Sequence, residues 1–268
     1  MATANISDHE FSQFQQLIYQ LAGIHLSPAK KALVSGRLAK RLSQHRLGSY
    51  GEYFRLLTGS RDSAELQIAV DLLTTNETYF FREPKHFDFL RNQIVSGHRP
   101  GRPFRVWSAA CSSGEEPYSI AMVLSDILGD AQWEVVASDI STRVLEKARR
   151  GHYSMERASG ISREHLSRYC LKGIGSQQGT LLVERGLRSR VSFKQVNLNQ
   201  PLPTMGEFDL IFLRNVMIYF DLETKRQVVR RMLPLLRSGG HFVIGHSESL
   251  NGVTDELKSV VPSVYRKA

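Results

Sequence analysis

The sequence predicts an α/β protein in which a mostly parallel β-sheet follows a small all-α domain. In the first 75 residues, apolar side chains recur at steps of three and four, which is the period of amphipathic helices. From Phe104 onwards, short apolar runs alternate with helical stretches, which is the pattern of βαβ units. We therefore expect a helical domain over residues 1–75 and a ligand-binding sheet domain over residues 76–268.

The helical domain begins with one apolar stripe and a helix stop. The stripe consists of Phe11, Phe14, Leu17, Ile18 and Leu21. Gly23 follows as a C-terminal cap, and Ser27-Pro28 is typical of the start of the next helix. Two further helices are expected over residues 49–57 and 63–73. No pattern in this domain indicates catalysis, but its second helix has a basic face formed by Arg37, Lys40 and Arg41.

Five strands and three helices are expected in the sheet domain. The strands cover residues 104–108, 134–138, 191–196, 208–213 and 241–245. The helices cover residues 118–128, 142–150 and 223–236. The segment 161–190 interrupts the alternation with Gly173, Gly175 and Gly179, so we expect an inserted small antiparallel β-subdomain there. Sheets of this kind bind ligands at the carboxyl ends of their strands.

Composition limits the class of protein and its partners. The chain has 268 residues, 41% of them hydrophobic, and its only cysteines are Cys111 and Cys170, so a disulfide scaffold is excluded. No apolar run approaches 18 residues and residues 1–10 are polar, so we expect no membrane span, no signal peptide and a cytoplasmic location. The net charge of +9 favours anionic partners, although a merely solvated basic face is the alternative.

The turn after the first strand has features of a ligand-binding loop. Residues 109–119 read AACSSGEEPYS, so small side chains let the backbone approach a ligand closely. The single glycine departs from the GxGxxG dinucleotide fingerprint, and Glu115-Glu116 would repel a pyrophosphate. These acids suit a cationic ligand such as S-adenosylmethionine, which carries an ammonium and a sulfonium. An ordinary tight turn with acids at a helix N-terminus is the alternative.

Polar residues also follow the other predicted strands. Asp139 lies 25 residues after Gly114, where an acid accepts hydrogen bonds from ribose hydroxyls. A helix N-cap is the alternative role for Asp139. Asn197 and Arg214-Asn215 follow two further strands, and an unpaired buried arginine is costly, which argues against a plain core role for Arg214.

The segment that joins the two domains combines aromatic and charged residues. Residues 73–83 read LTTNETYFFRE. Three consecutive aromatics beside Arg82 suit an apolar lid over a ligand with a cation for an anionic substrate. A linker whose aromatics pack on the sheet is the alternative. Tyr219, taken by itself, is more simply explained as a packed aromatic with its hydroxyl at the surface.

Five motifs occur in order along the chain, and the ordered set is specific. They are TTNETYFFR at 74–82, ACSSGEEPYS at 110–119, ASD at 137–139, RNVMIYF at 214–220 and GHSE at 245–248. In this combination the chain resembles the chemotaxis receptor glutamate methyltransferase family, CheR, over nearly its whole length. The resemblance implies a Rossmann-like class I methyltransferase sheet. It also implies methylation of glutamate carboxylates on the cytoplasmic helices of chemoreceptors, with S-adenosylhomocysteine as the other product.

The resemblance further implies a set of cofactor-site residues. They are Asn76, Thr78, Arg82, Glu116, Asp139, Asn197, Leu198, Arg214 and Asn215. Of the adjacent glutamates, Glu116 is the matching position and Glu115 the less certain one. In some family members the insertion docks a peptide from a receptor's C-terminus, and Gly173 and Gly175 resemble that form.

Within this function, we expect Arg82 and Tyr219 to orient the substrate carboxylate as catalytic residues. We expect Arg37, Lys40 and Arg41 to bind the Glu-rich receptor. Neither a metal nor a nucleic acid is expected. Three alternatives stay open. The first is a nucleic-acid methyltransferase, which the positive charge favours but the absence of an Asn/Asp-Pro-Pro-aromatic motif disfavours. The second is a nicotinamide dehydrogenase, which the missing glycines disfavour, and the third is an adaptor that binds S-adenosylmethionine without turnover.

Overall fold

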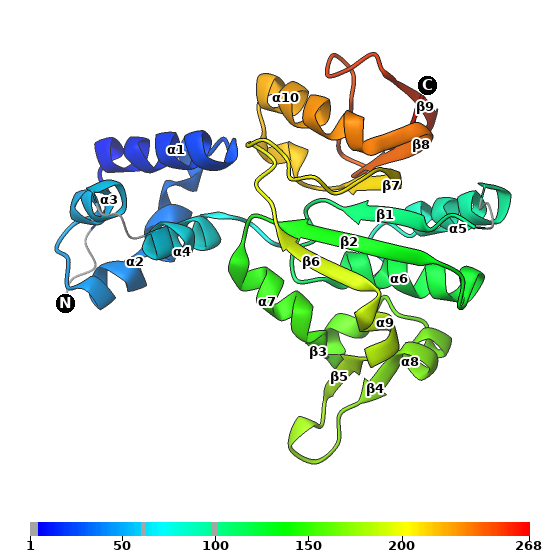
Figure 1. Cartoon of the computed structure of the whole chain (residues 1–268). Coiled ribbons are helices and arrows are strands. Elements are labelled where there is room, and N and C mark those ends of the chain that lie inside the picture. The colour runs from blue at the N-terminus through cyan, green and yellow to red at the C-terminus, as the bar shows by residue number, and fades with distance from the viewer. Residues whose placement is uncertain (1–4, 60–62, 98–100) are drawn as a thin grey trace.

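The computed structural model describes residues 5–59, 63–97 and 101–268, so the first four residues of the polar N-terminal stretch lie outside the described part. Figure 1 shows three parts: a helical bundle at the N-terminus, a central sheet with helices around it, and a small sheet that projects from the central one. This arrangement is the α/β class that the alternating apolar runs predict.

The N-terminal bundle is built as its apolar stripes predict. Its described elements are α1 (Asp8–Ala22), η1 (Pro28–Lys30), α2 (Lys31–His45), α3 (Tyr50–Gly59) and α4 (Ser63–Leu73). Ser7 and Glu10 form a capping box at the start of α1, and Gly23 ends that helix with a φ of 70°. Ser27-Pro28 starts the 3₁₀ turn η1 rather than α2 itself, so the chain makes one extra turn before the second helix.

The main sheet is mostly parallel. Its described strands are β1 (Phe104–Ser108), β2 (Trp133–Asp139), β6 (Val191–Gln195), β7 (Phe208–Leu213), β8 (Leu236–Ile244), β9 (Leu257–Val261) and β10 (Val264–Lys267). Their order is β6-β2-β1-β7-β8-β10-β9, and only β10 and β9 run antiparallel to their neighbours. The chain leaves β1 on one side for β2 and returns on its other side for β7. The topological switch point therefore lies between β1 and β7.

Two features of the C-terminal part differ from the prediction. The helix expected over residues 223–236 ends early, as α10 (Leu222–Met232), because Pro234 has no N–H to continue it. A 3₁₀ turn, η5 (Leu233–Leu235), leads directly into β8, which consequently starts at Leu236 rather than at 241. The sequence also does not predict the β9–β10 hairpin, since β9 is buried only at Leu257 and lacks an apolar alternation.

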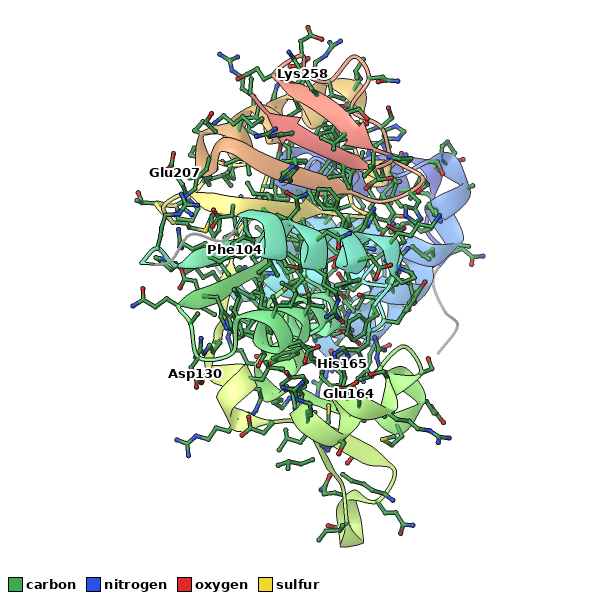
Figure 2. All side chains as sticks on the ribbon, turned by 90° about the vertical axis from the view of Figure 1, so that its right-hand side faces the viewer. Phe104, Asp130, Glu164, His165, Glu207 and Lys258 are labelled. Carbon is green, nitrogen blue, oxygen red and sulfur yellow. The ribbon has the colours of Figure 1, made fainter. Side chains whose placement is uncertain are left out.

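Helices cover both faces of the main sheet. One apolar core joins the sheet to α5 (Lys85–Gly97), α6 (Glu115–Leu128) and α7 (Thr142–Arg150), and a second core joins it to α10. Neighbouring residues of β7 serve the two cores, with Phe212 in the first and Ile211 in the second. Figure 2 shows Phe104 at the start of β1 and, at the periphery, the charged side chains of Asp130, Glu207 and Lys258. None of the described helices combines the length and the apolar character needed to cross a bilayer.

The insertion is an antiparallel β-subdomain, as predicted. Its sheet has the order β3-β5-β4, from β3 (His152–Ser154), β4 (Cys170–Lys172) and β5 (Thr180–Val183). Its other elements are η2 (Met155–Ala158), α8 (Arg163–Tyr169), η3 (Gly175–Gln177) and α9 (Arg185–Ser189). The subdomain thus begins earlier than the expected segment 161–190, because its sheet includes β3.

Polar contacts fix the helical bundle against the sheet domain. Asp71 at the end of α4 is buried and accepts hydrogen bonds from the backbone N–H of Thr142 at 3.0 Å and from its hydroxyl at 2.9 Å. An acid at this position also matches the positive N-terminal end of α7. The hydroxyl of Tyr19 donates to Asp221 at 2.7 Å, and the side-chain amide of Asn197 donates to the carbonyl of Leu21. The bundle is therefore held beside the carboxyl ends of the strands.

Candidate active site

A cavity of about 380 Å³ lies at the carboxyl ends of the central strands. Its walls come from the turns after β1, β2, β6 and β7, from the interdomain linker and from the helical bundle. Among its lining residues are Asn76, Thr78, Arg82, Glu116, Asp139, Asn197, Leu198, Arg214, Asn215 and Tyr219. The structure thus brings together all the residues expected at the cofactor site, and Tyr219 with them. This is the switch point where open α/β sheets bind ligands.

The turn between β1 and α6 is packed so tightly that it requires a glycine. Gly114 has a φ of 97°, and a Cβ atom there would lie 2.8 Å from the Cβ of Ala148 and 2.9 Å from the hydroxyl of Tyr153. Ser112 also has a positive φ, of 49°, and its hydroxyl donates to the carbonyl of Asn76 at 2.8 Å. The turn is therefore fixed to α7 and β3 on one side and to the interdomain linker on the other.

Asp139 presents a buried carboxylate to the cavity. Its Oδ2 accepts the backbone N–H of Ser112 at 2.9 Å, and its Oδ1 accepts that of Ser141 at 3.0 Å. Burial raises the pKa of Asp139 to about 6, although these N–H groups act to lower it. The N-cap of α7 is Ser141, whose hydroxyl accepts from the N–H of Val144. Asp139 is thus not the cap, and its remaining lone pairs are available to a ligand.

Arg214 is a buried cation held between two carboxylates. Its Nη1 donates to Glu116 at 2.7 Å and its Nη2 to Glu83 at 3.0 Å, and its side chain is 1% exposed. A buried charge needs such partners. The two ion pairs therefore explain why an arginine can be buried at the end of β7. The two adjacent glutamates separate as expected: Glu116 lines the cavity, whereas Glu115 does not and pairs with Arg157 of η2.

The loop that starts at Arg214 is tied to two other segments through carboxylates. Asn215 has a φ of 58°, and its backbone N–H donates to Glu248 at 2.9 Å while its side-chain amide donates to Glu83 at 3.2 Å. Glu248 also accepts the N–H of Gly245 at 2.7 Å. Burial acts to raise the pKa of Glu83, but the neighbouring Arg214 holds it below the ordinary value, so the carboxylate stays ionised. Three loops are thereby fixed around one wall of the cavity.

Comparison with protein families matches both parts of the chain. The CheR methyltransferase all-alpha domain matches residues 9–74, and the CheR methyltransferase SAM-binding domain matches residues 76–265. The chain belongs to the CheR methyltransferase family.

Curated relatives agree with this membership. The chemotaxis protein methyltransferase of Salmonella typhimurium is 44% identical over 263 residues, which cover 97% of this chain and 90% of the relative. That of Escherichia coli K12 is 45% identical over 249 residues, covering 92% and 86%. Chemotaxis protein methyltransferase 2 of Pseudomonas aeruginosa is 44% identical over 262 residues, covering 97% and 93%. These relatives support the chemotaxis reading and give no support to the nucleic-acid alternative.

The cofactor of this CheR protein is S-adenosylmethionine, as the sequence predicts. The cavity fits it in two respects. Its volume lies in the range of small-molecule sites. Its wall also offers the carboxylate of Asp139 with free lone pairs, and Glu116 among the lining groups. We propose that Asp139 accepts hydrogen bonds from the ribose hydroxyls.

Cofactor affinity is expected to fall as the pH is lowered through about 6. The raised pKa of Asp139 means that its proton competes with the ribose for the carboxylate, and by linkage the competition strengthens as the pH falls. The Kd of S-adenosylhomocysteine at pH 5 should be roughly tenfold larger than at pH 7.5, because one pKa unit is a factor of ten. Calorimetry at the two pH values measures this Kd. The Asp139→Asn variant should bind weakly at both pH values, and an unchanged wild-type Kd would contradict the assignment.

The interdomain linker contributes polar groups to the cavity but no aromatic lid. Phe80 is fully buried in the first core, and Phe81 packs against the same core. These two aromatics therefore pack on the sheet domain, which was the alternative to a lid. Tyr79 is half exposed, and the guanidinium of Arg82 lies 5.7 Å from the centre of its ring. Arg82 also donates to the carbonyl of Glu77 at 2.9 Å. The lid expectation fails because long-range packing decides where consecutive aromatics point.

The helical bundle forms one wall of the cavity, which the sequence does not predict. Among the lining residues are His25, Leu26 and Lys30, from the stretch between α1 and α2. The N–H of His25 donates to the carbonyl of Tyr219 at 2.8 Å, so this stretch is fixed to the loop after β7. The only local signal is the break between Gly23 and Ser27, which shows that a loop is present but not what it faces.

The three basic residues expected to bind the receptor have different environments. Arg37 turns inward and donates to the carbonyl of Thr74 at 3.0 Å. Burial lowers its pKa, and the neighbouring Arg143 adds to that effect. Arg41 forms an ion pair with the buried Glu65. Lys40 is exposed and has no ion pair among the described residues.

The glycines of the insertion lie outside the cavity, in the β-subdomain. Gly175 has a φ of 56° at the start of η3, and a Cβ atom on Gly173 would come within 2.5 Å of the hydroxyl of Thr180. Ile174, which lies between these two glycines, is 82% exposed, and Leu171, which precedes them in β4, is 56% exposed. An apolar hollow at this place includes both of these side chains.

Proposed function

We propose that this CheR protein transfers a methyl group from S-adenosylmethionine to glutamate side chains of chemoreceptors, forming glutamyl methyl esters and S-adenosylhomocysteine. The observation that carries the proposal is that one cavity joins an acidic cofactor wall to the cation of Arg82 and the hydroxyl of Tyr219. The names of the relatives, chemotaxis protein methyltransferases, support it. The substrates would be cytoplasmic receptor helices, and a cytoplasmic location is part of the proposal.

The acceptor requires no general base from the protein. A glutamate side chain has a pKa near 4.3, so at neutral pH it is already a carboxylate and a nucleophile. S-adenosylmethionine supplies an electrophilic methyl group carried on a positively charged sulfur. The residues of the cavity therefore act by binding and orienting the acceptor and by excluding water, and not by moving protons.

Arg82 and Tyr219 are the proposed residues that orient the acceptor carboxylate. Both line the cavity, and Tyr219 is held in place by the contact of its carbonyl with His25. The guanidinium of Arg82 already donates to the carbonyl of Glu77, so a substrate meets only part of its donor set. A weak contact is favourable here, since a firm bidentate pair would stabilise the ground state and raise the barrier.

Apolar groups in the cavity favour the reaction. Opposite charges disappear when a carboxylate takes a methyl group from a sulfonium, so water stabilises the reactants more than the transition state. The helical bundle contributes Ile24 and Leu26 to the wall, and the loop after β7 contributes Val216 and Phe220. These side chains, rather than Phe80 and Phe81, would limit hydration of the acceptor.

Reversing the charge of Lys40 is expected to slow methylation of the receptor without changing cofactor affinity. Lys40 is exposed on α2, and methylatable receptor helices are rich in glutamate, so a cation on this face speeds encounter. In Lys40→Glu, kcat/KM for the receptor should fall several-fold at low salt and recover towards wild type at high salt. The control is Lys258→Glu, the same change on the edge strand β9 (Figure 2). Equal losses in both variants would contradict the docking role.

The β-subdomain is proposed to bind the C-terminal peptide of a receptor. β4 is an edge strand of the small sheet, and an extended peptide can pair with such an edge. Leu171 and Ile174 beside it supply exposed apolar surface for a peptide side chain. This second contact would keep the enzyme near the methylation sites while each transfer takes place.

The proposed reaction is tested with labelled S-adenosylmethionine and membranes that carry a chemoreceptor. Label that is released as methanol in base identifies a carboxyl ester, which is the expected result. Label that resists base would indicate nitrogen methylation, and binding of the cofactor without label transfer would indicate an adaptor. Either outcome contradicts the proposal.

A receptor that lacks its C-terminal residues separates the two proposed contacts. It should be methylated more slowly than the intact receptor by wild-type enzyme, yet still give base-labile label. Equal rates for the two receptors would contradict peptide binding at the β-subdomain while leaving the proposed reaction intact.

A further inference from the structure

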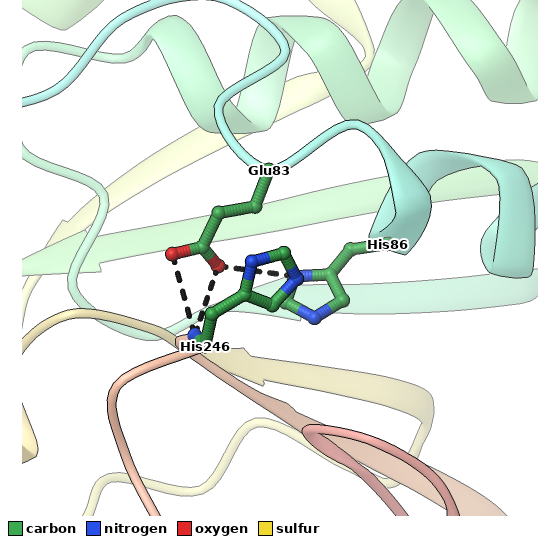
Figure 3. Close-up of side chains that lie close together, drawn as sticks. All are labelled: Glu83, His86 and His246. Atoms are coloured by element: carbon green, nitrogen blue, oxygen red, sulfur yellow. Dashed lines mark hydrogen bonds and ion pairs between the residues drawn. The ribbon is translucent and has the colours of Figure 1, made fainter.

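Glu83, His86 and His246 lie together beside the active-site cavity but do not line it. Figure 3 shows the carboxylate of Glu83 and the two imidazoles turned towards one another. Glu83 precedes α5, His86 lies in the first turn of α5, and His246 lies in the loop after β8. One potential ligand atom from each residue lies within 4.8 Å of the other two. The rings of His86 and His246 meet edge to face, with their centres 4.8 Å apart.

His86 is a buried polar group without a hydrogen bond. Its side chain is 2% exposed, and neither ring nitrogen has a hydrogen-bond partner among the described residues. Buried polar groups are almost always satisfied, so an orphan of this kind calls for a water or an ion. Burial, together with the nearby charge of Arg214, lowers the pKa of His86 to about 4, which keeps the ring neutral. A neutral imidazole is the form that binds metal ions.

The distance between the two nearest atoms suits a shared metal ion. Nδ1 of His86 and Oε2 of Glu83 are 3.4 Å apart without the geometry of a hydrogen bond. Two ligands that each lie about 2.0–2.1 Å from a tetrahedral zinc ion are separated by roughly 3.3 Å. His246 is exposed, so its ring can turn to bring a nitrogen closer. Its backbone N–H already donates to Glu83 at 3.3 Å.

The surrounding charges accept a divalent cation. Arg214 is the nearest cation, but Glu116 as well as Glu83 pairs with it, and Glu248 adds a third carboxylate through its contact with Asn215. The hydrogen bonds of Arg214 and Asn215 to Glu83 resemble the outer contacts that orient carboxylate ligands of metals. One positive charge among three negative charges leaves a net negative charge, which a divalent cation would offset.

We propose that Glu83, His86 and His246 form a site for a zinc-like divalent metal ion, with the fourth position open to solvent. Two imidazoles and one carboxylate favour zinc or a similar transition metal over magnesium or calcium. The ion would link the start of α5 and the residue Glu83 before it to the loop after β8, and so brace the wall that carries Arg214. This departs from the expectation from sequence that no metal is bound. The sequence gives no sign of the site because His246 lies 160 positions after His86.

Metal titration of the full-length, chelator-treated protein tests the site. Calorimetry should show one zinc ion per chain with a Kd in the micromolar range or tighter, and zinc should raise the midpoint of thermal unfolding. The His246→Asn variant, changed at an exposed side chain, should lose at least about tenfold in zinc affinity and most of the thermal shift. His9→Asn, an exposed histidine on α1, is the matched control and should bind zinc as wild type does.

Cobalt substitution identifies the ligand type. The spectrum of the Co²⁺ protein should show the d–d bands of a nitrogen and oxygen site without a thiolate charge-transfer band, which Cys111 or Cys170 would produce. Absence of saturable zinc binding, a thiolate band, or equal losses in His246→Asn and His9→Asn would each overturn the proposal.

Discussion

Replacing Arg214 with methionine is expected to lower the free energy of unfolding by about 3–5 kcal/mol at neutral pH. The change removes a buried cation and leaves Glu83 and Glu116 without their ion-pair partner. Cofactor binding should be lost as well, since Glu116 and Asn215 would no longer be held in the cavity wall. Urea unfolding and calorimetry measure the two effects. Arg226→Met, which removes an exposed arginine on α10, is the matched control and should cost less than about 1 kcal/mol.

The pH dependence of the same variant supplies an independent check. Glu83 has a lowered pKa in the folded protein, so its pairing with Arg214 stabilises the fold above the unfolded pKa and is lost as the pH falls through the folded one. The difference in stability between wild type and Arg214→Met should therefore narrow as the pH falls from 7 into the range in which Glu83 becomes protonated. A difference under 1 kcal/mol at pH 7, or one that does not change with pH, would contradict the role assigned to this ion pair.

Replacing Arg82 with alanine is expected to lower methyl transfer by roughly 100-fold while part of the cofactor affinity remains. Arg82 lines the cavity and is the proposed contact for the acceptor carboxylate, so its loss would misalign the acceptor, while Glu116 and Asp139 would remain in the cofactor wall. Both kcat and kcat/KM should fall, because the contact matters in the transition state. Single-turnover kinetics with receptor membranes and calorimetry with S-adenosylhomocysteine measure the two quantities.

Two comparisons make this prediction specific. Lys85→Ala removes a neighbouring exposed cation that does not line the cavity, and should leave turnover unchanged. Arg82→Lys keeps the charge but not the fork of donors, and should recover part of the activity. Unchanged turnover in Arg82→Ala, or a loss confined to cofactor binding, would refute the catalytic role.

The parts of the fold that follow from local pattern were predictable from sequence. β1, β7 and α7 have the predicted bounds because each is a short apolar run or an amphipathic segment with its own start and stop signals. The linker residues Asn76, Thr78 and Arg82 were implied by the resemblance to CheR, whereas the strand-end residues Asp139, Asn197, Arg214 and Asn215 were predictable for a related reason. Polar residues at the carboxyl ends of neighbouring parallel strands must lie near one another, whatever the details of packing.

Features that depend on long-range contacts were not predictable in this way. The wall formed by His25 and Lys30 depends on how the bundle docks, which is fixed by contacts such as Asp71 with Thr142. The aromatics of the linker look alike in sequence, yet Phe80 is in the core and Tyr79 is half exposed. Only the tertiary structure distinguishes these cases.

The central claim is that the cavity at the switch point holds S-adenosylmethionine beside the groups that receive an anionic side chain. A crystal structure of the protein grown with S-adenosylhomocysteine tests it most directly. The expected result is the ligand in this cavity, with its ribose hydroxyls at Asp139 and its sulfur on the side of Arg82 and Tyr219. A ligand bound elsewhere, or a cavity without ligand at saturating concentration, would contradict the claim.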